Sequence, residues 1–98
     1  MANFITRVEL HGADAADYEK LHTVMAEEKF YRTVMSAAGQ NFMLPTAMYF
    51  SYGEVTAEQV RDLARVAASR IGRPCWVFTA TWTDAAWYLP ETPQAGVP

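Results

Sequence analysis

Polar and apolar residues along this chain change period four times. Alternation with a period of two marks residues 3–11 and 75–82 as strands, and helical spacing of apolar residues marks 14–29 and 56–71 as helices. Between the helices, residues 30–52 are dense in β-branched and aromatic residues, which is typical of strands. Gly39-Gln40-Asn41 supplies turn chemistry inside this stretch. The pattern therefore predicts a strand, a helix, a hairpin with arms 30–36 and 46–52, a helix and a strand.

This order of elements predicts the fold. Right-handed crossovers in a βαββαβ chain give a ferredoxin-like α+β sandwich, a four-stranded antiparallel sheet of order 4-1-3-2 with two helices on one face. Residues 1–89 would form this single domain, and residues 90–98, rich in proline and glycine, a flexible tail. One face of the sheet would then lack helices, and a partner or a ligand would cover it unless it is polar.

The alternation also assigns faces to the strands. In the first strand, the residues expected to face the helices are Phe4, Thr6, Val8 and Leu10, and those expected on the open face are Ile5, Arg7, Glu9 and His11. In the second hairpin arm, the expected core set is Met48, Phe50 and Tyr52, with Ala47, Tyr49 and Ser51 on the open face. In the last strand, Trp76, Phe78 and Ala80 are expected to point inward.

Both helices carry capping signals and a buried stripe. Asp14 is the expected N-cap of the first helix, and Thr56 with Gln59 forms a capping box at the second. The stripe of the first helix is Tyr18, Leu21, Val24 and Met25, and that of the second is Val60, Leu63, Ala64, Ala67 and Ile71. His22 lies about 80° from the middle of the first stripe, at 100° per residue, so we expect it to be half exposed.

Composition limits the environment and the partners. The 98 residues carry a net charge of −3 and contain a single cysteine, Cys75, so no internal disulfide forms and no global field attracts nucleic acid. Without a long apolar run or a signal-peptide pattern, we expect a soluble, cytoplasmic protein that does not enter membranes. A small core, an open sheet face and the apolar residues 42–44 favour a homodimer.

Candidate chemistry gathers on the open face of the first strand. Arg7, Glu9 and His11 would stand in one row, with about 7 Å between neighbours, and could act as acid, base and phosphate ligand. Tyr49 beside them could stack a base, although packing or a dimer contact explains it more simply. The two histidines lack metal-ligand spacing, so we expect neither a metal site nor a cofactor.

Several short stretches resemble the family of the GhoS-type antitoxins. They are Arg7-Val8-Glu9-Leu10-His11, Asp17-Tyr18, Leu21-His22 with Met25, Phe30 with Arg32-Thr33, Leu44-Pro45-Thr46-Ala47, and Trp87-Tyr88. The resemblance implies a ferredoxin-like domain related in shape to the Cas2 nucleases, and an endoribonuclease that acts on a toxin's messenger RNA. It implies that the basic positions of the first helix fall at Lys20 and His22. Glu9 and His11 stand where the Cas2 pattern has an aspartate.

Two hypotheses of function follow. One is a metal-independent endoribonuclease, with His22, Glu9 and His11 as the catalytic residues and Arg7, Lys20, Arg32 and Tyr49 as the RNA-binding residues. The other is a non-catalytic module, an antitoxin or inhibitor that docks on a partner protein. The acidic balance of the chain favours the second hypothesis, and the family resemblance favours the first.

Overall fold

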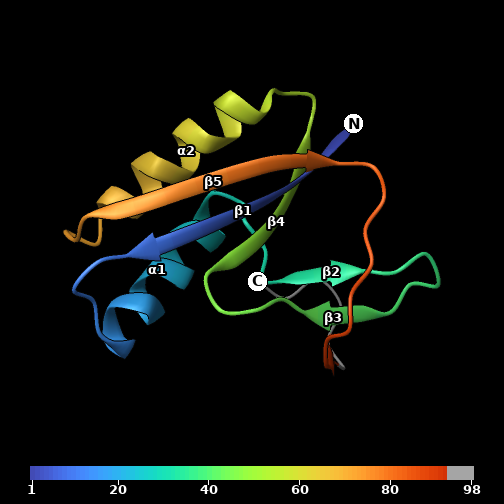
Figure 1. Ribbon diagram of the computed structural model, residues 1–98, viewed down its shortest axis with the longest axis horizontal. Coiled ribbons are helices and arrows are strands. Elements are labelled where there is room, and N and C mark those ends of the chain that lie inside the picture. Colours follow the sequence, from blue (N-terminus) through green and yellow to red (C-terminus); the bar gives the residue numbers. More distant parts are fainter. Residues whose placement is uncertain (93–98) are drawn as a thin grey trace.

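The computed structural model describes residues 1–92 and has an α+β fold (Figure 1). Its elements are β1 (Ala2–Leu10), α1 (Ala15–Glu27), β2 (Thr33–Met35), β3 (Asn41–Met43), β4 (Met48–Gly53), α2 (Ala57–Ser69), β5 (Cys75–Trp82) and β6 (Glu91–Thr92). The expected class, two helices with antiparallel strands, is confirmed. Neither helix has the length or the apolar run that crossing a bilayer requires.

The strands form two small sheets in place of the expected four-stranded sheet. The first sheet has the order β4-β1-β5 and the second the order β2-β3-β6, all antiparallel. The first sheet thus contains three of the four strands expected in the ferredoxin-like sheet, in the expected order. At the fourth place, beside β4, residues 1–92 contribute an isolated bridge between Tyr31 and Phe50 and no strand. Beyond this bridge the chain turns away from β4, and β2 pairs with β3 (Figure 1).

The predicted hairpin is therefore wrong in its pairing. Residues 37–45, expected as a turn, contain β3, which folds back on β2 with Val34 opposite Phe42. Phe42 also lies against Trp87, with ring centroids 5.8 Å apart, and Leu44 is buried. The tail expected over residues 90–98 is described only as far as Thr92, where Pro90 and β6 hydrogen-bond to β3. The apolar residues 42–44 are consequently engaged within the chain.

The main core lies between the first sheet and the two helices. Phe4, Thr6 and Val8 of β1 are fully buried, as the alternation predicts. Leu21 and Met25 of α1 and Ala64 of α2 pack against this side of the sheet. Both predicted caps are present as reciprocal capping boxes, Asp14 with Asp17 and Thr56 with Gln59.

The faces predicted for β4 are wrong. Ala47, Tyr49 and Ser51 are buried, whereas Met48 and Phe50 are half-buried and Tyr52 is exposed. The pairing with β1 explains the difference, because Tyr49 lies opposite Thr6, and directly paired residues point to the same face. A shift of one residue in our assignment moved the whole set to the other side of the sheet.

The faces predicted for β5 are reversed as well. Trp76 and Phe78 are 69% and 72% exposed, while Cys75 and Val77 pack against the core. Phe78 lies opposite Arg7 and Trp76 opposite Glu9, so both aromatic rings share the helix-free face of the sheet with these charges. Cys75 is a free cysteine of intermediate exposure.

One position of the α2 stripe also differs from the expectation. Leu63 is 44% exposed, although Val60, Ala64 and Ala67 are buried as predicted. Ala68 takes the fourth buried place. The buried side of α2 is lined mainly by alanines, so this helix lies close to the sheet and a narrow stripe suffices to cover it.

Candidate functional site

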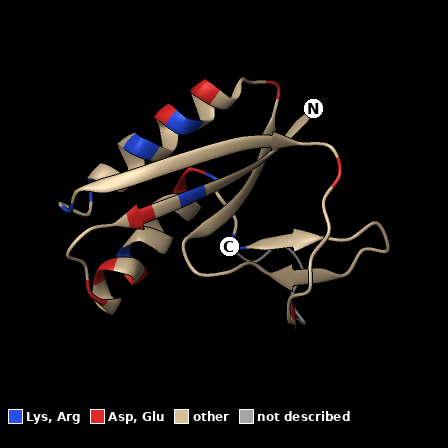
Figure 2. Ribbon diagram, in the orientation of Figure 1, with Lys and Arg blue, Asp and Glu red and all other residues tan. Residues whose placement is uncertain are grey.

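The outer face of the first sheet, which carries no helix, brings together five side chains from two neighbouring strands. They are Arg7 and Glu9 of β1, His11 just after it, and Trp76 and Phe78 of β5. Figure 2 shows the two charges of β1 in an otherwise uncharged sheet, since β4 and β5 contain no Lys, Arg, Asp or Glu. We call this set the outer-face cluster. It surrounds a shallow hollow of ≈ 350 Å³ lined by Arg7, Glu9, Val77 and the two aromatic residues.

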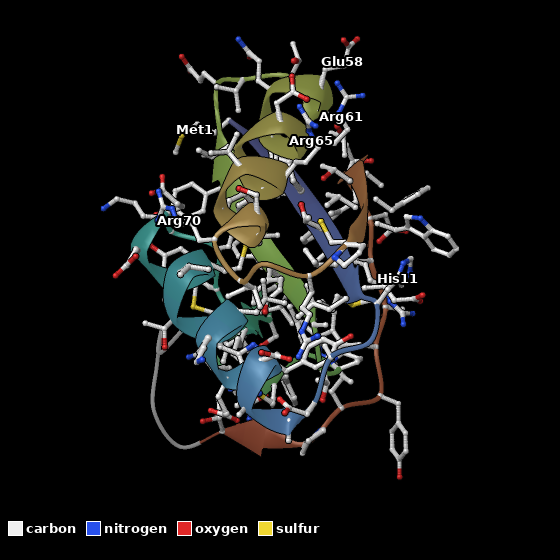
Figure 3. All side chains as sticks on the ribbon, turned by 90° about the vertical axis from the view of Figure 1, so that its left-hand side faces the viewer. Met1, His11, Glu58, Arg61, Arg65 and Arg70 are labelled. Carbon is white, nitrogen blue, oxygen red and sulfur yellow. The ribbon has the colours of Figure 1, made fainter. Side chains whose placement is uncertain are left out.

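Two contacts fix the imidazole of His11. Its Nε2 lies 3.2 Å from Oε2 of Glu9, and the edge of its ring meets Trp76 with centroids 4.2 Å apart and the planes nearly perpendicular. The side chains of His11 and Glu9 remain 33% and 45% exposed, so solvent reaches both. Figure 3 shows His11 on the outer side of the sheet, away from the helices. A carboxylate that orients one imidazole nitrogen leaves the other to exchange a proton with a substrate.

Arg7 adds a permanent positive charge to the same row. It is exposed and lies opposite Phe78, two residues from Glu9 along β1. A guanidinium binds phosphate in a bidentate manner, and exposed aromatic rings on a sheet stack unpaired bases. The outer-face cluster therefore holds the group types that single-stranded RNA recognition and general acid–base chemistry need.

His22 lies on the opposite side of the sheet from this cluster. Its Nδ1 is 2.7 Å from the hydroxyl of Tyr49, and His22 is only 9% exposed. Our expectation of a half-exposed flank residue is therefore wrong, because β4 presents Tyr49 to α1 where we expected an apolar face. Burial, and then the nearby Arg32 guanidinium, lower the pKa of His22, while Glu19 opposes them. The neutral imidazole is thus the form that the fold favours.

The remaining predicted RNA ligands are dispersed. Tyr49 is fully buried and cannot stack a base, and burial raises the pKa of its phenol. Arg32 lines a different hollow, of ≈ 540 Å³, together with His22 and the carboxylate residues Glu19 and Glu27. Lys20 is exposed on α1. Its charge helps to lower the pKa of the Asp17 carboxyl, although a backbone hydrogen bond and the Arg73 guanidinium lower that pKa more. These residues do not form one site with Glu9 and His11.

Trp76 and Phe78 are the site residues that the sequence interpretation missed. The residues of Cys75–Trp82 do alternate between the two faces of the sheet. The sequence interpretation placed the large aromatic residues on the core face, which is the wrong one of the two. The contact of Thr79 with buried Thr6, whose hydroxyls lie 2.9 Å apart, places the odd-numbered residues of β5 on the helix side, and only the fold reveals this contact.

The other end of the outer face is covered by the chain itself. Residues 85–89 lie across it and enclose an apolar pocket of ≈ 290 Å³ with Ile5, Met48 and Trp82. Within residues 1–92, no three side chains of His, Cys, Asp or Glu come together as a metal-binding group. The charged strand residues of this face, Arg7 and Glu9, both belong to the outer-face cluster.

Comparison with known proteins gives no assignment: no family model matches the chain, and no curated protein sequence matches it. The resemblance to GhoS-type antitoxins is accordingly a hypothesis.

Proposed function

We propose that the protein binds single-stranded RNA on the outer-face cluster and cleaves it without a metal ion, as an antitoxin-type endoribonuclease with a ferredoxin-related fold. The observation that carries this proposal is the exposure of Trp76 and Phe78 directly beside Arg7, Glu9 and His11. Exposure of large aromatic side chains to water is unfavourable, so a group of them on a surface indicates a binding site. Bases stack on such rings in sequence-tolerant RNA binding.

Cleavage would use the 2′-hydroxyl of the RNA as the nucleophile. Neutral His11, held by Glu9, takes the hydroxyl proton as the 2′-oxygen bonds to phosphorus. The bond to the 5′-oxygen breaks, the leaving oxygen takes a proton from water, and the hydroxide that this leaves recovers the proton from His11. Arg7 neutralises the charge that develops on the phosphoryl oxygens. The products are a 2′,3′-cyclic phosphate and a 5′-hydroxyl, which distinguishes this chemistry from hydrolysis by a metal-activated water.

Stacking is tested by truncating the two rings. We expect Trp76→Ala and Phe78→Ala each to weaken binding of a fluorescent single-stranded RNA by roughly 5- to 150-fold, since base–aromatic stacking contributes about 1–3 kcal/mol per base. Val66→Ala is the control, because Val66 is also an exposed apolar residue but lies on α2, outside this face. Equal affinity of all three variants and the wild type would reject the RNA-binding surface.

A second candidate function is a protein-binding module that docks through the same face. The specific observation in its favour is that Trp76, Phe78 and Tyr52 are all exposed on a chain of net charge −3. Exposed Trp and Tyr residues are frequent anchors of protein interfaces, and an acidic protein does not attract RNA at long range. Wild-type protein that binds no RNA at low salt would favour this alternative.

A further inference from the structure

Within residues 1–92, no strand pairs with the outer edge of β5. β5 spans Cys75–Trp82 and hydrogen-bonds on one side only, to β1, at the end of the order β4-β1-β5. Natural proteins protect such edges with charged residues, proline, bulges or very short strands. This strand of 8 residues contains neither a charged residue nor a proline. Its N–H and C=O groups are therefore ready to pair with another strand.

The helix above this edge carries a regular charge pattern. Glu58, Arg61, Asp62 and Arg65 lie within an arc of about 100° at 100° per residue, and all four are exposed. In Figure 3, Glu58, Arg61 and Arg65 extend from the side of α2 toward β5, whereas Arg70 extends from the other side. Along the helix the signs read negative, positive, negative, positive. Such a sequence is complementary to itself when it is read in the opposite direction.

We propose that a second copy of this chain pairs antiparallel with β5, edge to edge, so that the two first sheets become one continuous sheet. A two-fold axis normal to the sheet runs α2 antiparallel to its counterpart on the same face. Glu58 then lies opposite Arg65 of the partner subunit, and Arg61 opposite Asp62 of the partner subunit. Within residues 1–92, Glu58 and Arg65 form no ion pair, while Arg61 and Asp62 lie 2.9 Å apart.

The strand and the helix agree on where this axis passes. The middle of β5, between Phe78 and Thr79, lies about 12 Å from the start of the strand at 3.3 Å per residue. The middle of the charge pattern, between Arg61 and Asp62, lies about 11 Å from the end of α2 at 1.5 Å per residue. Since both are measured from the same α2–β5 turn, one axis serves both elements. The interface leaves the outer face open, so it does not depend on the proposed RNA binding.

Charge reversal tests this arrangement in a way that ordinary loss of stability cannot imitate. Glu58→Arg alone and Arg65→Glu alone each place like charges opposite each other twice per dimer, and we expect each to weaken self-association by about 10-fold or more. The double variant Glu58→Arg/Arg65→Glu exchanges the two signs and restores wild-type association. Sedimentation at micromolar to submillimolar concentrations measures the self-association of each variant. A monomeric wild type, or a double variant no better than the single ones, would overturn the proposal.

Cross-linking tests the strand pairing independently. In a Cys75→Ser background, Phe78→Cys lies near the two-fold axis, where Cα atoms of antiparallel neighbours are about 4.5–5.5 Å apart and a disulfide fits. We expect oxidation to cross-link it to a covalent dimer. Tyr52→Cys is the control, since Tyr52 is also exposed and lies on β4, at the opposite edge of the first sheet. Cross-linking of the Tyr52 variant but not the Phe78 variant would assign the interface to another surface and reject the β5 edge.

Discussion

At the scale of single residues, one hydrogen bond shows that His22 and Tyr49 belong to the core and not to a binding site. Their 2.7 Å contact joins α1 to β4 beneath the surface. Removing one partner leaves the other buried and unpaired. We therefore expect His22→Ala to lower the free energy of unfolding by about 1–3 kcal/mol. His11→Ala, a change on the open face, should cost less than about 0.5 kcal/mol. Denaturant unfolding checks both values, and equal stabilities would contradict the burial of His22.

The same residue gives the stability a pH dependence. Burial lowers the pKa of His22 from its ordinary value of 6.5, so the unfolded chain binds more protons than the folded one below that pH. Stability is therefore fully present above pH 6.5 and falls as the pH decreases toward the lowered pKa. The variant His22→Gln lacks this contribution, so its stability should fall less between pH 7 and 5. The Asp17 carboxyl does not interfere, because its pKa is lowered from 3.8. Parallel curves for the two proteins would contradict the argument.

At the scale of elements, the position of α2 on the sheet determines which of its residues contribute to the stability of the fold. Leu63, expected in the core, is exposed, whereas Val60 is buried. Leu63→Ala should therefore cost under about 1 kcal/mol, although a buried leucine would cost about 2–5 kcal/mol. Val60→Ala, a smaller truncation, should cost more, roughly 1–3 kcal/mol. Thermal or denaturant unfolding decides the order, and a larger loss at Leu63 would show that α2 is rotated.

The sequence predicted those features that short-range physics determines. Both N-caps, the period of β1 and the burial of Leu21 and Met25 in α1 depend on residues a few positions apart, and they were confirmed. The faces of β4 and β5 were not, because parity along a strand is set by its partner: Tyr49 is buried through its place opposite Thr6. The candidate site inherited this error. Glu9 and His11 were placed on the correct face, but their aromatic neighbours were assigned to the core.

At the scale of the whole molecule, the acidic charge limits how RNA could be held. Arg7 is the one permanently charged cation among the strand residues of the outer face, so few phosphates are neutralised there. Each neutralised phosphate contributes a slope of about −0.7 to log K against log salt for single strands. We expect a total slope near −1. A titration over a range of salt concentrations measures it, and a steep slope would indicate a basic surface other than the outer-face cluster.

The most direct test of the account compares the two histidines in RNA cleavage. With chelator present, single-turnover cleavage of a single-stranded RNA by wild-type protein should yield cyclic phosphate ends. His11→Ala and Glu9→Gln should slow it by roughly 10²-fold or more, as removal of a general acid–base group does. His22→Gln, assayed where it remains folded, should cleave at nearly the wild-type rate because His22 lies on the other side of the sheet. Loss of cleavage in His22→Gln with full activity in His11→Ala would contradict the assignment of the site to the outer face.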